Sequence, residues 1–424
     1  MKNTVASGKI DKRTLITIIV LGFCWTMNYA LAQIQYVLYD PMVETLGITN
    51  AQLGFLMTIF GLGNIFGAPI GGWLSDKFNY KKIYVASLVI TGIISIIFAF
   101  NMTYSFAMIV WGFLAVSALL MNYPAHIKIL RMLVDEKNQG KIFGLNEGAT
   151  GIASIIANWF FIAIFSKFTE AHYGIKTVII IMGVFAFLAA ILSFIFIPNP
   201  DQMPGAAEES VEEKKKLTIK DFFAVIKSPA TWIVGIGLFA IYSLYVTMTY
   251  FTPYFSSAFG ITASATAFLA IIRTYVLRVF GAPIGGAISD KLGSPSKVMF
   301  ITYIIALISL LGFIFLPKGT PFALIIFLTL LVAIFVYMSR GVYYAVASEI
   351  HIPRNITATT IGIAAILGFS PDLFQYMMYG HWIDRYGVTG YKFMFIYQIA
   401  VIIIALIPCT YIIRSKKKKQ VNNQ

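Results

Sequence analysis

A few charged residues lie inside long apolar stretches of this sequence, and these residues are the most able to do chemistry. They are Lys128, Glu147, Arg273, Arg278, Arg340 and Asp372. A charge in an apolar segment is costly, so it normally binds a partner, an ion or a substrate. Three arginines against one deep carboxylate, Asp372, leave positive charge uncompensated, and a guanidinium group holds an anion through paired hydrogen bonds. We therefore expect a small anion to bind among the arginines.

The same residues also allow a structural interpretation. Arg278 shares a helical face with Gly281 and Gly285, so it could pair with Asp372 across a packed interface. In a regular α-helix Arg273 lies five residues and about 140° away from Arg278, because each turn holds 3.6 residues. We therefore expect Arg273 to point elsewhere and to be the better candidate for a cavity.

Asp372 is also the candidate for proton coupling, because an acid beside arginines could change its charge as substrate binds. Glu147 is a second coupling candidate, and it lies near the expected cytoplasmic surface. Lys128 is expected to extend its ammonium group to that surface. Arg340 is expected to bind substrate, with a backbone carbonyl or Glu349 as alternative partners.

Neutral polar and aromatic residues in the segments NYALAQIQY and YSLYVTMTYFTPY complete the expected site. The candidates for substrate binding are Asn28, Gln33, Gln35, Tyr242, Tyr245 and Asn122. In the register of the two halves, Arg278 matches Asn64 and Arg340 falls near Asn122, so the second half carries cations where the first carries amides. Hydrogen bonding between helices is the alternative role for each neutral residue.

The elements that position these residues must be membrane-spanning helices. The 424 residues are 58% hydrophobic and only 12% charged, whereas soluble domains carry about 25% charged residues. Stretches such as IYVASLVITGIISIIFAF are long enough to cross a bilayer, and we expect an all-α membrane protein with about twelve spans. Cys24 and Cys409 lie in apolar stretches and the histidines show no ligand spacing, so we predict neither a metal site nor a cofactor.

Charge asymmetry predicts the topology and the domain boundaries. The formal net charge is +14, and the Lys and Arg residues cluster in alternate loops and in the tails, so both termini are expected in the cytoplasm. We expect a cytoplasmic N-terminus at 1–14, a six-helix bundle at 15–197, a linker with an interfacial helix at 198–229, a second six-helix bundle at 230–413 and a basic tail at 414–424.

An internal repeat supports the two-bundle organisation. FGAPIGG begins at Phe66 and again at Phe280, and Gly-Ile-Thr begins at Gly47 and again at Gly260. Glycines four residues apart in both copies should let another helix approach closely. Ser-Asp-Lys follows each copy, and the acid is expected to face the positive end of a neighbouring helix and keep the cytoplasmic side closed. The gating candidates are Asp76, Lys77, Asp290 and Lys291.

The repeat and the loop GGWLSDKFNYKK resemble the major facilitator superfamily. This resemblance implies twelve helices in two pseudo-symmetric six-helix bundles that rock about a midplane site. It also implies that every third span is peripheral, and the third, sixth, ninth and twelfth expected spans contain no Asp, Glu, Lys or Arg. Asn79 stands where the family usually has glycine.

The run YPAHIKILRMLVDEKNQGKIFGL resembles sugar-phosphate and organic-anion permeases of that superfamily. Cationic-drug antiporters are disfavoured, because Trp111 takes the usual Arg position and the fifth span has no Gly-Pro. The expected function is a proton-coupled carrier of a carboxylate, sulfonate or sugar acid, acting as a monomer in a bacterial inner membrane. Organophosphate:phosphate exchange and a non-transporting receptor remain the alternatives, and no enzyme motif is present.

Overall fold

The computed structural model describes residues 11–134, 139–199, 225–315, 320–350 and 354–422, and every regular element in these ranges is helical. Most of the expected linker helix LTIKDFFAVIK lies outside the described residues. So do the side chains of several residues within helices, Asp76 among them. The helices group into two compact units.

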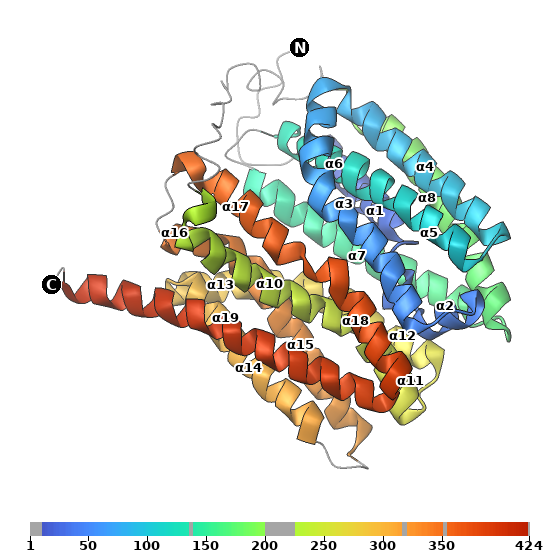
Figure 1. Ribbon diagram of the computed structural model, residues 1–424. Coiled ribbons are helices and arrows are strands. Elements are labelled where there is room, and N and C mark those ends of the chain that lie inside the picture. The colour runs from blue at the N-terminus through green and yellow to red at the C-terminus, as the bar shows by residue number, and fades with distance from the viewer. Residues whose placement is uncertain (1–10, 135–138, 200–224, 316–319, 351–353, 423–424) are drawn as a thin grey trace. The chain divides into compact units, whose positions relative to one another are not determined.

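Unit 1 comprises residues Met1–Ile34, Glu44–Gly47 and Ile59–Lys214. Its helices are α1 (Lys12–Tyr29), α4 (Tyr80–Phe100), α5 (Tyr104–Ala115), η2 (Val116–Asn122), α6 (Tyr123–Met132), α7 (Gln139–Phe165), α8 (Ala171–Phe196) and most of α3 (Asn50–Lys77). The helix α4 packs along α8, and α1 packs on α7 and α8 (Figure 1). The small residues Gly92 and Gly183 meet where α4 and α8 are closest.

Unit 2 comprises residues Gln35–Val43, Ile48–Thr58 and Lys215–Gln424, so it includes the start of α3 and most of α2 (Tyr39–Leu46). Its remaining helices are α10 (Pro229–Thr249), α11 (Phe251–Phe259), α12 (Ala263–Ile271), η6 (Ile272–Val276), α13 (Leu277–Leu292), α14 (Pro295–Phe315), α15 (Phe322–Val342), η7 (Tyr343–Ala345), α16 (Val346–Glu349), α17 (Arg354–Phe369), α18 (Pro371–Tyr386) and α19 (Val388–Asn422); the short η1 (Ile34–Tyr36) begins in unit 1. The helix α14 packs between α15 and α19 (Figure 1).

Helices occupy every position where the sequence predicts a span. Among the described residues, nine helices are long and apolar enough to cross a membrane, or ten if α2 and the first part of α3, bent by 104° relative to each other, count as one span. The eleventh expected span is divided at Ser370, where α17 ends and Pro371 begins α18. A proline fits the first turn of a helix, whose amide groups have no partner inside the helix.

The repeated sequences perform the same local tasks in both halves. Gly47 and Gly260 adopt positive φ angles of 60° and 65° directly after α2 and α11, a conformation that glycine adopts without strain. The threonine two residues later then accepts a hydrogen bond from a backbone amide in the first turn of the next helix, at Gln52 and at Ala265. The Gly-Ile-Thr repeat therefore ends one helix and begins another.

The glycines of the longer repeat are sites of close helix packing, as predicted. A Cβ atom at Gly67 or Gly71 would lie within 2.6 Å of the backbone of η2, and one at Gly281 or Gly285 within 2.5 Å of α15. Real Cβ contacts are never this short, so only glycine permits these approaches. In unit 2 the atom that a Cβ at Gly281 would meet belongs to Tyr337, which places this tyrosine against α13.

Candidate functional site

A π-helical segment carries Arg273 in unit 2. The helices α12 and α13 are joined by η6, and the Leu277 amide donates to the Ile272 carbonyl five residues earlier. Residues five apart in a π-turn lie about one turn above each other, whereas in an α-helix they are well separated around the axis. The expected angle of about 140° between Arg273 and Arg278 assumes a regular α-helix, and the π-segment changes the helical register between these two residues. Such segments are frequent at functional sites.

Arg273 is buried, with 1% of its surface exposed. One guanidinium nitrogen, Nη2, donates to Thr252 Oγ1 at 2.9 Å, whereas Nε and Nη1 have no hydrogen-bond partner among the described residues. The guanidinium carbon lies 6.0 Å from the centroid of the Phe251 ring. A buried cation with two unmatched donors costs several kcal/mol unless an anion joins it. Burial thus makes Arg273 the strongest anion-binding candidate among the side chains that the structure describes.

Tyr337 of α15 interacts with all three candidate arginines. Its hydroxyl donates to the Thr274 carbonyl in η6 at 2.7 Å. Electrostatic interactions link its phenol group with Arg273 and also with Arg278 and Arg340. Arg278 and Arg340 interact with each other as well. We call Arg273 the first arginine pole and Arg278 with Arg340 the second arginine pole.

Stacked tyrosines connect the second arginine pole to Asp372. The Arg340 guanidinium lies 4.7 Å from the centroid of the Tyr245 ring, a cation–π contact. Tyr245 stacks on Tyr242 with 5.8 Å between centroids, and the Tyr242 hydroxyl donates to Asp372 Oδ2 at 2.8 Å. Asp372 is 3% exposed. Asp372 therefore contacts one member of this aromatic pair and Arg340 the other.

Sequence reasoning missed two tyrosines that adjoin the acid. The hydroxyls of Tyr36 and Tyr376 are 3.0 Å apart, and both residues interact electrostatically with Asp372. The Tyr36 ring also meets the Tyr245 ring edge to face at 6.1 Å. The tyrosines Tyr242 and Tyr245 of α10 are visible in the sequence. Their interaction with Tyr36 and Tyr376 depends on tertiary packing.

In unit 1 the predicted amides belong to a buried polar network. Asn28 Oδ1 accepts from Thr91 Oγ1 at 2.7 Å, and Asn122 Nδ2 donates to Ser87 Oγ at 2.9 Å. Ser117 connects the two ends, because its hydroxyl bonds to Thr91 at 2.6 Å and donates to the Ser87 carbonyl at 2.7 Å. These contacts join α1, α4 and η2, so they support the alternative of hydrogen bonding between helices. Asn28 Nδ2 and Asn122 Oδ1 keep no partner in the described residues.

Sequence reasoning assigned no role to His126, which is 1% exposed in α6. Its Nδ1 bonds to the Tyr84 hydroxyl at 3.1 Å, and its ring meets Trp25 edge to face at 4.8 Å. The predicted coupling residue Glu147 interacts electrostatically with His126, although Glu147 itself is exposed. Gln33 is half-buried in the turn after α1, and Gln35 is buried.

The predicted gating residues show no common arrangement. The side chain of Asp76 lies outside the described residues, and Asp290 and Lys291 are exposed. Lys77 lies over the ring of its neighbour Trp73, 4.9 Å from the centroid. Lys128 donates to the Ser75 carbonyl at 3.3 Å instead of extending freely to the surface.

Two other acids accept hydrogen bonds from amide groups at the start of a neighbouring helix, which is the role expected of Asp76 and Asp290. Glu349 accepts from the Ser296 amide at 2.9 Å in the first turn of α14. Asp384 accepts from the Asn50 amide at 2.9 Å, the Asn50 side chain at 2.7 Å and the Ala51 amide at 2.8 Å at the start of α3. Its segment GHWIDRYG has the spacing of GGWLSDKFN and GGAISDKL, with glycine four residues before the acid and a basic residue directly after it.

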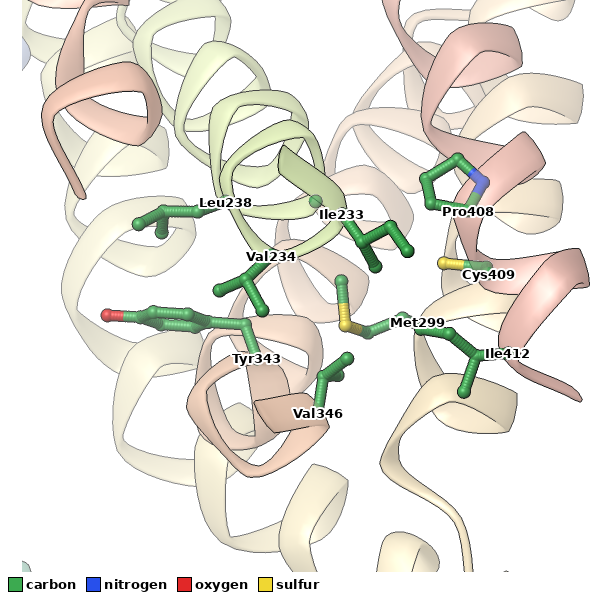
Figure 2. Close-up of a pocket in the computed structure, with 10 residues that line it drawn as sticks. Ile233, Val234, Leu238, Met299, Tyr343, Val346, Pro408, Cys409 and Ile412 are labelled. Carbon is green, nitrogen blue, oxygen red and sulfur yellow. The ribbon is translucent and has the colours of Figure 1, made fainter. Parts of the chain in front are cut away.

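A pocket in unit 2 is too apolar to receive an anion (Figure 2). Its lining includes Ile233, Val234, Met299 and Ile412, with the Cys409 thiol on one wall. The arginine poles contribute no residue to this lining. The pocket therefore has no part in the candidate site.

Two units of packed helices, with a buried arginine and a buried acid inside the expected spans, are typical of a polytopic membrane protein. The chain belongs to the Major Facilitator Superfamily, whose family model matches residues 14–371. It is 30% identical over 377 residues to the inner membrane protein YqcE of Escherichia coli K12, covering 88% of each chain. It is 24% identical to the probable galactarate/D-glucarate transporter GudP of the same organism, over 68% of this chain and 69% of GudP.

A solved structure shares the fold at low sequence identity. A bacterial homologue of the human lysosomal transporter Spinster, in an inward-facing and unoccupied conformation, matches with a TM-score of 0.75 and 17% identity. The match covers 97% of this chain and 99% of that one. The superfamily consists of transporters, so the prediction that the protein is not an enzyme is confirmed.

Proposed function

We propose that the protein is a proton-coupled carrier of a small organic anion, with a sugar acid as the preferred class. The observation that carries this proposal is the first arginine pole: a guanidinium that is 1% exposed and has two nitrogens without partners. A carboxylate satisfies both nitrogens through charge-assisted hydrogen bonds. A neutral substrate would leave the buried charge uncompensated.

The relatives support the sugar-acid class. GudP bears the name of a probable transporter of galactarate and D-glucarate, which are hydroxylated carboxylates. Tyr242 and Tyr245 offer hydroxyl groups and aromatic faces beside the second arginine pole, which suits a hydroxylated substrate. The name of YqcE supports a location in a bacterial inner membrane. The basic loops and tails favour cytoplasmic termini.

The assignment of substrate charge can be tested by ligand-dependent stability. The thermal stability of the purified protein is measured with carboxylates, sulfonates, sugar acids, organic phosphates and neutral sugars. A ligand at 100 times its dissociation constant should add about 2.7 kcal/mol to the unfolding free energy. Stabilisation by one anion class that is lost in Arg340→Gln supports the proposal. Stabilisation by neutral sugars alone would contradict it.

Asp372 is the proposed proton-coupling residue, because it is buried within a cluster of tyrosines at the acidic end of the site. Asp372→Asn keeps an oxygen for Tyr242 but cannot carry the proton. In liposomes with a pH gradient, we expect this variant to lose accumulation of substrate and to keep counterflow exchange. Glu170→Gln, which changes an exposed acid, is the matched control. Full accumulation by Asp372→Asn would remove the residue from the coupling mechanism.

A further inference from the structure

We propose that His126 is a proton-binding site in unit 1, distinct from the proposed coupling residue Asp372 of unit 2. Its imidazole lies in α6 and is 1% exposed, and the proposed anion site does not use it. Histidine is the side chain whose charge normally changes between about pH 5 and 8. A buried imidazole can take up a proton only if the groups around both ring nitrogens accept an N–H.

The Nδ1 atom of His126 faces a hydroxyl group, which can either donate or accept a hydrogen bond. It lies 3.1 Å from the Tyr84 hydroxyl of α4. The Tyr84 phenol also interacts with Cys24, whose own thiol donates to the Ala189 carbonyl at 3.3 Å. The Cys24 sulfur is therefore a weak acceptor for the Tyr84 hydroxyl when Nδ1 carries a hydrogen. Nδ1 can thus be protonated without leaving the Tyr84 donor unmatched.

The Nε2 atom of His126 faces an acceptor that lacks a donor. His126 Nε2 and Asn146 Oδ1 are both buried without a hydrogen-bond partner among the described residues, and the two side chains interact with each other. An imidazolium carries a hydrogen on each nitrogen. Its Nε2–H would donate to Asn146 while its Nδ1–H donates to Tyr84. The protonated ring therefore has an acceptor at both nitrogens.

Two neighbours offset the positive charge of a protonated ring. Glu147 of α7 interacts electrostatically with the imidazole, and its side chain is exposed. A carboxylate stabilises a neighbouring imidazolium, and an exposed carboxylate can pass a proton between water and the ring. Trp25 of α1 meets the ring edge to face with 4.8 Å between the centroids, so an imidazolium gains a cation–π contact with the indole.

The other titratable groups around the ring stay uncharged or point elsewhere. Tyr84 and Cys24 are neutral over the range in which histidine titrates. Lys128 lies two residues along α6, and residues two apart on a helix do not face each other. Its ammonium group donates to the Ser75 carbonyl at 3.3 Å. Among the described side chains, Glu147 is therefore the charged group that acts on His126.

Nuclear magnetic resonance of the purified full-length protein with ring-labelled histidine tests this site directly. The chain has four histidines, and the His126 signal is the one that is missing in His126→Gln. We expect this signal to move reversibly between about pH 4 and 8, while circular dichroism shows that the protein stays folded. A constant His126 signal over the range in which the exposed His172 titrates would overturn the proposal. If His126→Gln does not fold, Tyr84→Phe identifies the signal, because it removes the hydroxyl bonded to Nδ1.

The consequence for transport is tested by counterflow of radiolabelled D-glucuronate in liposomes, and this part rests on the proposed function. The pH is equal on both sides, and Asp372→Asn is the background, so that Asp372 contributes no proton. We expect the exchange rate to change at least about threefold between about pH 5.5 and 7.5. Adding His126→Gln should abolish this change, whereas adding the matched control His172→Gln should preserve it.

The two measurements fail separately. A pH dependence of exchange that survives His126→Gln would overturn a role of the His126 proton in transport. If the parent protein exchanges no sugar acid, the proposed function fails, while the resonance titration still decides whether His126 binds a proton.

Discussion

Asp384 should hold the start of α3 in place by capping its first amide groups. The variant Asp384→Ala should release the start of this helix. The carboxylate accepts three hydrogen bonds from Asn50 and Ala51, at 2.7–2.9 Å. Replacing such a helix cap by alanine costs about 0.5–2 kcal/mol. Residues 48–58 of α3 belong to unit 2, and from Ile59 onward α3 belongs to unit 1. The hydrogen bonds of Asp384 therefore stabilise only states in which residues 48–58 pack within unit 2. A loss of about 1.4 kcal/mol would raise the population of the released state about tenfold.

The released state can be measured through Leu53, which is fully buried in the start of α3. A Leu53→Cys probe is placed in a protein whose native cysteines, Cys24 and Cys409, are replaced by serine. Its rate of labelling by a maleimide should rise about tenfold with Asp384→Ala. Asp11→Ala is the control, because Asp11 caps only its own helix through the Thr14 amide at 2.9 Å. Equal labelling rates with and without Asp384, or an equal rise with Asp11→Ala, would refute the claim that Asp384 stabilises the packed start of α3.

Three further substitutions test the contacts around the site. Tyr242→Phe removes the hydrogen bond to Asp372 Oδ2, so uptake driven by a pH gradient in liposomes should fall. Unchanged uptake would contradict this. Gly54→Ala should lower the unfolding free energy by about 1–3 kcal/mol, because its Cβ would lie 2.4 Å from the Tyr376 carbonyl. Gly72 faces open space, so Gly72→Ala should not lower the unfolding free energy, and thermal denaturation compares the two variants. Asn28→Ala should destabilise the protein by about 1–3 kcal/mol and leave the substrate dissociation constant within twofold, as calorimetry can show.

The positions of the spans could be predicted because each depends on the summed hydrophobicity of many residues. Each span is an apolar run of about 20 residues, and local irregularities do not hide such a run. The repeated glycines were equally clear, since a row of small residues every fourth position predicts close packing. The contacts of Gly67 with η2 and of Gly285 with α15 confirm this prediction.

The identities of the charged candidates were also visible in the sequence, but their positions around the helix axis were not. A regular helix places Arg273 and Arg278 about 140° apart, and the π-segment changes the register between them. The segment coincides with a tertiary hydrogen bond, from Tyr337 on α15 to the Thr274 carbonyl. Because that partner lies 63 residues away along the chain, no local pattern could reveal the change of register.

The acids at helix starts show a different limit of sequence reasoning. A helix leaves its first amide groups without intrahelical partners, so an acid from any nearby element can satisfy them. The sequence predicts such contacts for Asp76 and Asp290, because these acids follow the repeated glycines, and the side chain of Asp76 lies outside the described residues. At the start of α14 the acceptor is Glu349, and at the start of α3 it is Asp384. At Asp384 the glycine four residues earlier is a site of close helix approach: a Cβ at Gly380 would lie 2.3 Å from the Asn50 carbonyl. The glycines with the same spacing before Asp76 and Asp290, Gly72 and Gly286, have no atom within 4 Å of such a Cβ. The spacing alone therefore does not predict which acid caps a neighbouring helix, because that depends on whether tertiary packing brings a helix start against the glycine.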